Sequence, residues 1–206
     1  MDERGPRGRG RPRRQATSRV AAAGLRLIRE HGFEATTAAA IAAEAGIGRS
    51  TFFRYFASKD EILWHCHAEQ VMALEARLAG MPDAPDPLRV VMDAVVDAAG
   101  DVRPGEARAA RDYQAIIVER PDLDPMGAAW SQRRTTAIRD YVAAALGRDR
   151  NDALPVAFAF AVEAAVRAAG VAFAHSEGVE LADLVASCVR PVYVGFSREG
   201  MGPSAE

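Results

Sequence analysis

Residues 36–60 limit the possible folds of this chain more than any other stretch. They begin with Thr36 and Thr37, whose hydroxyl groups can cap the start of a helix. An alanine-rich segment follows, and Ile41 gives it an apolar face. Gly46 then supplies the left-handed backbone conformation with which helices often end. The pattern predicts a short helix that ends in a tight turn.

The segment after that turn predicts a second short helix, which opens at Gly48. Phe52 and Phe56 are four residues apart, so they share one face, which we expect to be buried. The remaining faces are polar, basic and aromatic, and they carry Arg49, Ser50, Thr51, Phe53, Arg54 and Tyr55. A recognition helix needs one apolar stripe for docking and one polar surface for DNA, so the two helices indicate a helix-turn-helix.

The run from Gly46 to Asp60, GIGRSTFFRYFASKD, resembles the signature of the TetR/AcrR family of bacterial one-component regulators. The match in motif covers roughly residues 17–64. The wording RSTFFRYF within it also resembles the mycofactocin-linked regulators of actinobacteria. The resemblance implies a homodimer that binds palindromic double-stranded operator DNA and responds to a small-molecule effector, which in the mycofactocin-linked subgroup is an acyl-CoA thioester.

The resemblance assigns DNA contacts position by position. Arg49, Ser50 and Phe53 stand where family members reach base edges, and an arginine can bind guanine O6 and N7 with two hydrogen bonds. Phe53 replaces the family's usual tyrosine and loses its phenolic hydrogen bond, whereas Tyr55 replaces the common histidine and keeps a hydroxyl donor. The other residues expected to contact DNA, mostly through phosphates, are Thr36, Thr37, Thr51, Tyr55 and Lys59.

Charge is distributed unevenly along the chain. Residues 1–59 contain 12 basic and 5 acidic side chains, net +7, whereas the remainder carries net −9. This asymmetry indicates that only the N-terminal part meets a polyanion. Residues 1–16 are rich in Gly, Pro and Arg, so we expect a disordered basic arm. Its run Arg9–Arg14, with Arg11 as the candidate contact, resembles an AT-hook that enters a narrow minor groove. A solvated tail that adds affinity without sequence preference is the alternative.

The whole chain predicts an all-α fold of about nine helices. We expect residues 17–60 to form an N-terminal three-helix, helix-turn-helix DNA-binding head, and residues 61–206 to form a helical ligand-binding and dimerisation body. Ser58 and Glu61 have the spacing of a capping box at the start of the fourth helix. Beyond the two short helices, the predicted helices span about 18–31, 59–80, 86–99, 104–119, 124–147, 152–175 and 181–196, the last interrupted by Pro191.

Composition supports a soluble globular protein. The chain has 206 residues, of which 49% are hydrophobic and 26% charged, enough to bury a sizeable core. No apolar run approaches the roughly 18 residues of a membrane span, and no apolar signal-peptide core follows the N-terminal arginines. We therefore expect a cytoplasmic protein without membrane contact. Cys66 and Cys188 are predicted to be buried, unpaired thiols.

The predicted body helices carry apolar and aromatic residues whose simplest role is core packing. In the TetR/AcrR family the helices after the head surround a mostly apolar pocket, so the resemblance implies that some of these side chains bind ligand. The candidates are Met92, Val96, Arg111, Tyr113, Ile117, Trp130, Phe158 and Phe173. The Arg133–Arg134 pair is either a solvated face or a site for an acidic group of the ligand.

Other functional classes lack their motifs. His65, Cys66 and His67 are consecutive and would point about 100° apart on a helix, so they do not form a metal site. The chain has no nucleophile elbow or phosphate-binding glycine loop, so we expect neither an enzyme nor a cofactor. The expected function is a ligand-responsive transcriptional repressor, released from its operator by a small apolar or amphipathic effector. The alternatives are a ligand-independent architectural DNA-binding protein and an activator of the same family.

Overall fold

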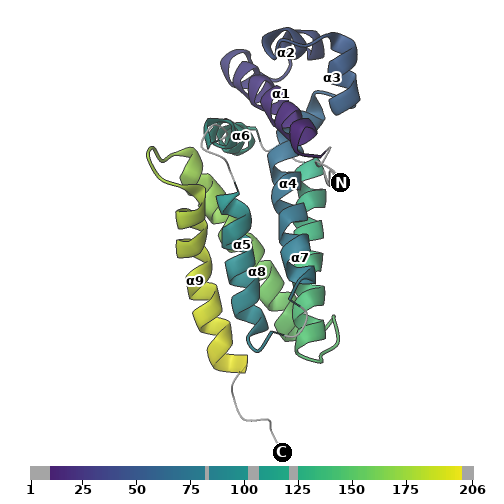
Figure 1. The fold of residues 1–206 in the computed structure, drawn as a ribbon. Coiled ribbons are helices and arrows are strands. Elements are labelled where there is room, and N and C mark those ends of the chain that lie inside the picture. The colour runs from purple at the N-terminus through teal and green to yellow at the C-terminus, as the bar shows by residue number, and fades with distance from the viewer. Residues whose placement is uncertain (1–9, 82–83, 102–106, 121–124, 201–206) are drawn as a thin grey trace, which may run out of the picture. The chain divides into compact units, whose positions relative to one another are not determined.

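The computed structural model describes residues 10–81, 84–101, 107–120 and 125–200. These residues form helices and contain no strand, so the predicted all-α class is confirmed (Figure 1). In chain order the helices are α1 (Gly10–His31), α2 (Ala38–Glu44), α3 (Arg49–Tyr55), α4 (Asp60–Ala79), α5 (Pro87–Gly100), α6 (Ala107–Glu119), α7 (Pro125–Ala145), α8 (Ala153–Ala174) and α9 (Leu181–Gly200).

The chain divides into two compact units, Met1–Cys66 and His67–Glu206. We call the first unit the head and the second the body, and we describe each by itself. The division falls inside α4, whose first residues belong to the head and whose remaining residues belong to the body. One continuous helix therefore carries the chain from one unit into the other.

The head is a three-helix unit completed by the start of α4. Phe52 and Phe56 are 0% and 3% exposed, so the predicted buried face of α3 is confirmed. Ile41 of α2 and Leu25 of α1 are also fully buried, and α2 packs against both α1 and α3. Gly46 has φ +69°, which confirms that the turn between α2 and α3 needs the left-handed conformation. The apolar core of the head thus fixes how α3 is presented.

Helix α1 begins at Gly10, well before Ser18, where the sequence placed its start. Residues 10–16 are therefore helical, and the expectation of disorder was wrong for them. The physical reason is that Pro12 lies in the first turn, where its missing N–H removes no intrahelical hydrogen bond. Residues 1–9 of the expected arm lie outside the described part of the chain.

The start of α4 also differs from the capping-box expectation. The helix begins at Asp60, and the Glu61 carboxylate accepts a hydrogen bond of 2.7 Å from the backbone N–H of Ala57 rather than from that of Ser58. Glu61 therefore reaches back to the turn before α4 as expected, but its partner is Ala57, one residue earlier than the expected Ser58.

The body is a bundle in which α8 packs against α6, α7 and α9, and α5 packs against α7 and α9. Asp86 caps α5 by accepting a hydrogen bond from the Arg89 N–H at 3.0 Å, with Pro87 in the first turn, so this helix begins close to its predicted start at residue 86. Pro191 does not end α9, which continues through it. Neither Cys66 nor Cys188 takes part in a disulfide, and both are only half-buried, so the expectation of buried thiols was wrong.

Helix α8 is, by length and composition alone, long and apolar enough to cross a membrane. A membrane span was not expected from the sequence, because no uninterrupted apolar run approaches roughly 18 residues. Phe158, Ala159 and Val162 are fully buried in the core of the bundle, as expected for the central helix of a helical domain. Only 39% of the apolar window of α8 is buried, however, so much of its surface is left uncovered by this chain.

Candidate functional site

Helix α3 presents the residues expected to read DNA bases. Arg49, Ser50 and Phe53 are exposed, and Phe53 has 46% of its surface accessible although it is a large apolar side chain. The Arg49 guanidinium lies 5.6 Å from the centre of the Phe53 ring, and that ring packs edge-on against buried Phe52 at 5.2 Å. The buried ring therefore supports the exposed one, which in turn supports the arginine.

Two further α3 residues expected at phosphates, Thr51 and Tyr55, are half-buried. The Arg54 guanidinium lies 5.6 Å from the centre of the Tyr55 ring, so the exposed face of α3 carries two arginine–aromatic pairs. Arg11 lies in the first turn of α1, but its side chain is outside the described part of the structure. An extended AT-hook at that point would require this turn to unwind.

The threonines at the start of α2 have separate roles. Thr37 is the N-cap, and its hydroxyl accepts a hydrogen bond from the Ala40 N–H at 3.1 Å, as the sequence predicted. Thr36 is 3% exposed, and its hydroxyl donates to the Gly32 carbonyl at 2.8 Å. The structure therefore places the Thr37 side chain at the surface and the Thr36 side chain inside the head.

Lys59, expected at a phosphate, is engaged within the head. Its ammonium donates to the carbonyls of Phe33 and Thr36 at 2.5 and 3.0 Å. It also lies 4.1 Å from the centre of the Phe33 ring, which is cation–π distance. Lys59 thus fastens the residue before α4 to the loop that leads into α2.

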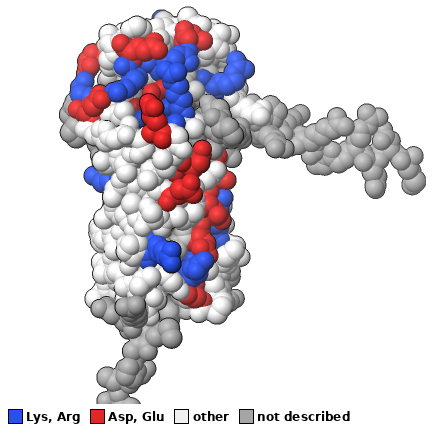
Figure 2. Space-filling view, turned by 90° about the vertical axis from the view of Figure 1, so that its left-hand side faces the viewer, with Lys and Arg blue, Asp and Glu red and all other residues white. Residues whose placement is uncertain are grey.

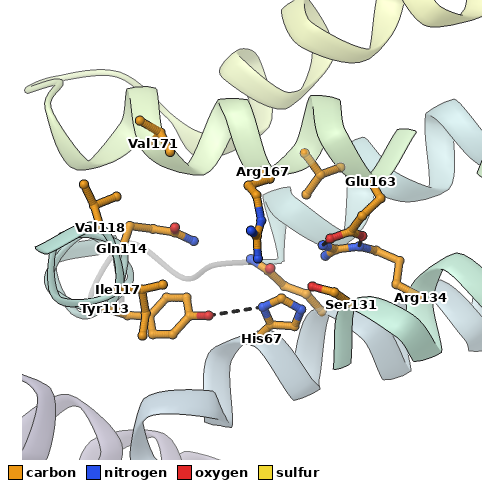
Figure 3. Close-up of a pocket in the computed structure, with 12 residues that line it drawn as sticks. His67, Tyr113, Gln114, Ile117, Val118, Ser131, Arg134, Glu163, Arg167 and Val171 are labelled. Carbon is orange, nitrogen blue, oxygen red and sulfur yellow. Dashed lines mark hydrogen bonds and ion pairs between the residues drawn. The ribbon is translucent and has the colours of Figure 1, made fainter. Parts of the chain in front are cut away.

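The body contains a cavity of about 300 Å³ whose wall is built from α4, α6, α7 and α8 (Figure 3). The wall has a polar part and an aliphatic part. The described residues that line it are His67, Gln70, Tyr113, Gln114, Ile117, Val118, Ser131, Arg134, Glu163, Val166, Arg167 and Val171.

A buried ion pair forms one part of this wall. Arg134 and Glu163, on α7 and α8, have side chains that are 6% and 14% exposed. Arg134 donates two hydrogen bonds to the Glu163 carboxylate, Nε to Oε2 at 2.6 Å and Nη2 to Oε1 at 2.9 Å. Burial alone raises the pKa of Glu163, but the hydrogen bonds and charge of Arg134, with a hydrogen bond from Ser131, lower that pKa below its ordinary value. The pair is therefore ionised and self-neutralising.

His67, on α4, faces the cavity across from this pair. Its Nδ1 lies 3.2 Å from the Tyr113 hydroxyl, while its buried Nε2 has no hydrogen-bond partner among the residues that the structure describes. Burial, followed by the positive charges of Arg134 and Arg167, lowers the pKa of His67 from 6.5 to about 3, although the Glu163 charge opposes the shift. The imidazole is therefore neutral near pH 7, with one ring nitrogen left for a bound molecule.

The opposite part of the cavity is aliphatic and open. Ile117 and Val118 come from α6 and Val171 from α8, and Val118 and Val171 are 37% and 44% exposed. Arg167 is also exposed and extends from α8 toward the space above His67 (Figure 3). The mouth therefore combines an apolar edge with one guanidinium, which suits a molecule that is itself part polar and part apolar.

The predicted ligand residues are divided among several places. Tyr113 and Ile117 line the cavity. Met92 and Val96 line a separate groove of about 480 Å³ between α5 and α9. Trp130 lies on α7 with the Arg133 guanidinium 5.1 Å from its ring.

The other three candidates have contacts within the body itself. Phe158 and Phe173 are 0% and 1% exposed and belong to the hydrophobic core, as the alternative of core packing anticipated. The Arg111 guanidinium lies 4.6 Å from the Phe173 ring and donates to the Val179 carbonyl at 2.9 Å. Arg111 therefore holds the loop between α8 and α9.

Sequence reasoning missed several residues of the cavity. His67 was considered only as a metal ligand, and Gln114 was not singled out. A usable signal was present in α8, where Glu163 and Arg167 are charged residues inside an otherwise apolar helix. Charged residues within an apolar helix indicate a polar cavity or a partner helix, because a charge that becomes buried needs a partner. Arg134 was recognised as one of a pair, and the structure separates that pair into a buried and an exposed member.

Comparison with known proteins identifies both units. Residues 20–66 match the family described as bacterial regulatory proteins, tetR family, and residues 85–197 match the MftR C-terminal domain. The chain is 26% identical over 193 residues to a Mycobacterium tuberculosis protein named as a mycofactocin biosynthesis transcriptional regulator, MftR. That match covers 92% of this chain and 95% of the relative.

Solved structures show the same fold. Thermus thermophilus FadR, a TetR-family repressor in complex with lauroyl-CoA, has a TM-score of 0.52 at 22% identity, covering 92% of this chain and 97% of that chain. NalD of Pseudomonas aeruginosa, the secondary repressor of a multidrug efflux pump, has a TM-score of 0.62 at 19% identity, covering 88% and 97%. The relatives in this family are regulators rather than enzymes. The chain therefore belongs to the TetR family of bacterial transcriptional regulators and carries a C-terminal domain of the MftR type.

Proposed function

We propose that this regulator is a cytoplasmic, ligand-responsive repressor. It binds a palindromic operator as a homodimer and is released by a small amphipathic effector that enters the body cavity. The observation that carries the proposal is the cavity itself, because α4 contributes His67 to its wall and the same helix begins in the head. The polar and aliphatic parts of that wall set the chemistry of the effector.

The DNA contacts follow from the exposed face of α3. Arg49 stacks on Phe53, which restricts its rotamers before DNA is present and lowers the entropy cost of two hydrogen bonds to guanine. Phe53 is exposed and apolar, as a contact to a thymine methyl requires. Thr37 and Tyr55 are candidates for phosphate contacts, while Lys59 positions the loop before α2.

The effector needs both a polar group and an apolar portion. With the Tyr113 hydroxyl donating to Nδ1, neutral His67 carries its proton on Nε2. This N–H and the Arg167 guanidinium favour a hydrogen-bond acceptor such as a carbonyl or carboxylate. Ile117, Val118 and Val171 favour an aliphatic portion. The lauroyl-CoA bound by the related Thermus thermophilus FadR is amphipathic in the same sense. A cavity of about 300 Å³ has room for the acyl part of such a molecule, with a large head group left outside the mouth.

The continuous helix α4 links effector binding in the body to DNA binding by the head. An effector that draws His67 toward its polar group shifts a helix whose first residues, from Asp60, pack in the core of the head. Ile62 and Leu63 of this helix are 0% and 1% exposed, so the head cannot remain in place while they move. Such coupling typically amounts to about 1–3 kcal/mol per effector.

Dimerisation is supported by apolar surface that this chain leaves open. Phe160 on α8 is 62% exposed, and Val194 on α9 is 39% exposed. Figure 2 shows a face of the body on which charged side chains are sparse. Pairing α8 and α9 with the same helices of a second copy would cover such a surface in a four-helix bundle, and the two-fold axis would match a palindrome.

The test combines effector binding with operator release. Operator affinity is measured by fluorescence anisotropy with and without lauroyl-CoA or laurate, after calorimetry has established which of them binds. We expect bound effector to weaken operator affinity by about 5- to 150-fold. Ile117→Trp, which fills the cavity, should keep operator affinity and lose the response, whereas Met72→Trp, at an exposed position on α4, should keep both. Saturating effector that leaves operator affinity unchanged contradicts the proposal.

A further inference from the structure

A second, smaller chamber adjoins the body cavity. It has a volume of about 30 Å³ and shares four wall residues with the larger cavity, Gln70, Gln114, Arg134 and Val166. These shared residues form the partition between the two spaces. Behind the partition the chamber is lined, apart from Gly170, by apolar side chains of α4, α5 and α9, which are Leu74, Val95, Ala98, Ala99, Leu181 and Val185.

The wall of the inner chamber is mostly apolar. Its polar side chains are confined to the partition and are Gln70, Gln114 and Arg134. Arg134, one of these, already donates two hydrogen bonds to Glu163. A volume of about 30 Å³ accommodates on the order of one or two carbon atoms. The chamber is therefore a place for the end of an aliphatic chain.

Gln114 is the part of the partition that lies against Gly170 and can move away from it. Its side-chain amide lies directly against the backbone of α8 at Gly170, where an added Cβ would be only 2.6 Å from Oε1 and 3.0 Å from Cδ. The absence of a side chain at Gly170 thus creates the seat for the amide. Glutamine has three rotatable side-chain bonds, so the amide can leave this seat without any movement of the helices. Arg134, held by its ion pair, cannot do so as readily.

We propose that Gln114, seated against Gly170, is the gate that sets the length of an unbranched aliphatic effector. The polar end of the effector stays near His67 and Arg167, and its last carbons displace the Gln114 amide and enter the inner chamber. The proposal rests on the proposed function, because it assigns a chain-length rule to the same effector site. It also places the effector against Leu74 of α4 and Val185 of α9 at once.

The test uses straight-chain carboxylates from hexanoate to dodecanoate, with dissociation constants measured by calorimetry. For the wild-type protein we expect affinity to rise about fourfold per added carbon until the inner chamber is full. Ala98→Leu fills the chamber, so its affinities should match the wild type for short chains and fall about 4- to 16-fold for the longest. Gln114→Ala removes the gate, so the longest chains should gain at least about fourfold.

Val118→Ala serves as the matched control, because Val118 lies at the mouth of the cavity and outside the inner chamber. It should change the affinity for every chain length by a similar factor. Circular dichroism and thermal melting confirm that each variant is folded, and Gln114→Ala keeps the test decisive if Ala98→Leu is unstable. Carboxylates that bind with the same length dependence in all four proteins overturn the gate but leave the proposed function standing. Failure of every member of the series to bind overturns the linear-chain assignment, and operator release by other ligands then tests the proposed function separately.

Discussion

Arg133 and Arg134 are adjacent in the sequence, yet the structure gives them different surroundings. Arg134 pairs with Glu163 inside the body, whereas Arg133 pairs with Glu75 through contacts of 2.6 and 2.7 Å at the surface. Both pairs are bidentate, so they differ mainly in burial. The two pairs therefore allow the stabilisation from a buried ion pair to be compared with that from an exposed ion pair on the same helix.

Glu163→Gln should destabilise the protein far more than Glu75→Gln. The first change leaves Arg134 charged and buried without its counter-ion, which costs about 3–5 kcal/mol, whereas an exposed pair contributes about 0–1 kcal/mol. Urea denaturation at pH 7 measures both free energies of unfolding. Similar losses for the two variants would show that the Arg134–Glu163 pair is not buried as described.

The same pair predicts a pH dependence. The pKa of Glu163 is lower in the folded protein than its ordinary value of 4.5, so folding is favoured by the ionised carboxylate above that value. This stabilisation should be lost as the pH falls through the lowered pKa. In Glu163→Gln the fall in unfolding free energy below pH 4.5 should therefore be shallower than in the wild type.

Lys59 is predicted to act on DNA affinity through position rather than through charge. Lys59→Arg keeps the charge but does not reproduce the ammonium held by the Phe33 and Thr36 carbonyls. Both Lys59→Arg and Lys59→Met should weaken operator binding, with the slope of log affinity against log salt unchanged. A phosphate contact would instead lower that slope by about 1 in Lys59→Met and spare Lys59→Arg.

At the scale of the helix, α4 is the element on which ligand response depends. Ala68→Gly lies just after the division between head and body and softens the helix by about 1 kcal/mol. Without effector, the operator affinity of Ala68→Gly should stay within about twofold of the wild-type value. Bound effector should weaken operator affinity less in this variant than in the wild type. Ala137→Gly on α7 is the control with the same loss of helix propensity. An unchanged response in Ala68→Gly would show that the signal does not pass along α4.

Helix starts show how far local sequence rules reach. Thr37 was expected to cap α2 because its hydroxyl can accept a hydrogen bond from a backbone N–H, and the structure confirms this cap. The start of α1 was placed too late because a composition rich in Gly, Pro and Arg favours disorder, although Pro12 is tolerated in a first turn. Local sequence chemistry therefore predicts the presence of a helix more reliably than it predicts the first residue of that helix.

Cavity residues were harder to predict, because periodicity identifies the apolar face of a helix but not the helix that packs against it. Phe158 and Phe173 have the same character as Tyr113 and Ile117, yet the first two fill the core and the second two face the cavity. Whether such a side chain lines the cavity depends on residues that are distant in the sequence and pack around it. The α3 face could be predicted because its residues are contiguous and their burial follows from one helix alone.

At the scale of the molecule, the account requires two copies of the chain. Phe160→Glu places a charge on the exposed apolar surface of α8, and a two-fold axis places it there twice. In analytical ultracentrifugation at micromolar concentration, the wild type should be a dimer and Phe160→Glu a monomer. Met72→Glu, an equally apolar exposed position on α4, should leave the dimer intact. A monomeric wild-type protein would contradict the proposal that a two-fold dimer binds a palindromic operator.

Specific binding to a palindrome by a dimer is the property on which the proposed function depends. The most direct measurement is a selection of genomic DNA fragments with the purified full-length protein at physiological salt, read by sequencing. The account predicts enriched fragments that share a palindrome whose half-sites are about one helical turn apart, near a promoter. Enrichment of A·T-rich fragments without a shared palindrome would contradict it and would favour an architectural DNA-binding protein.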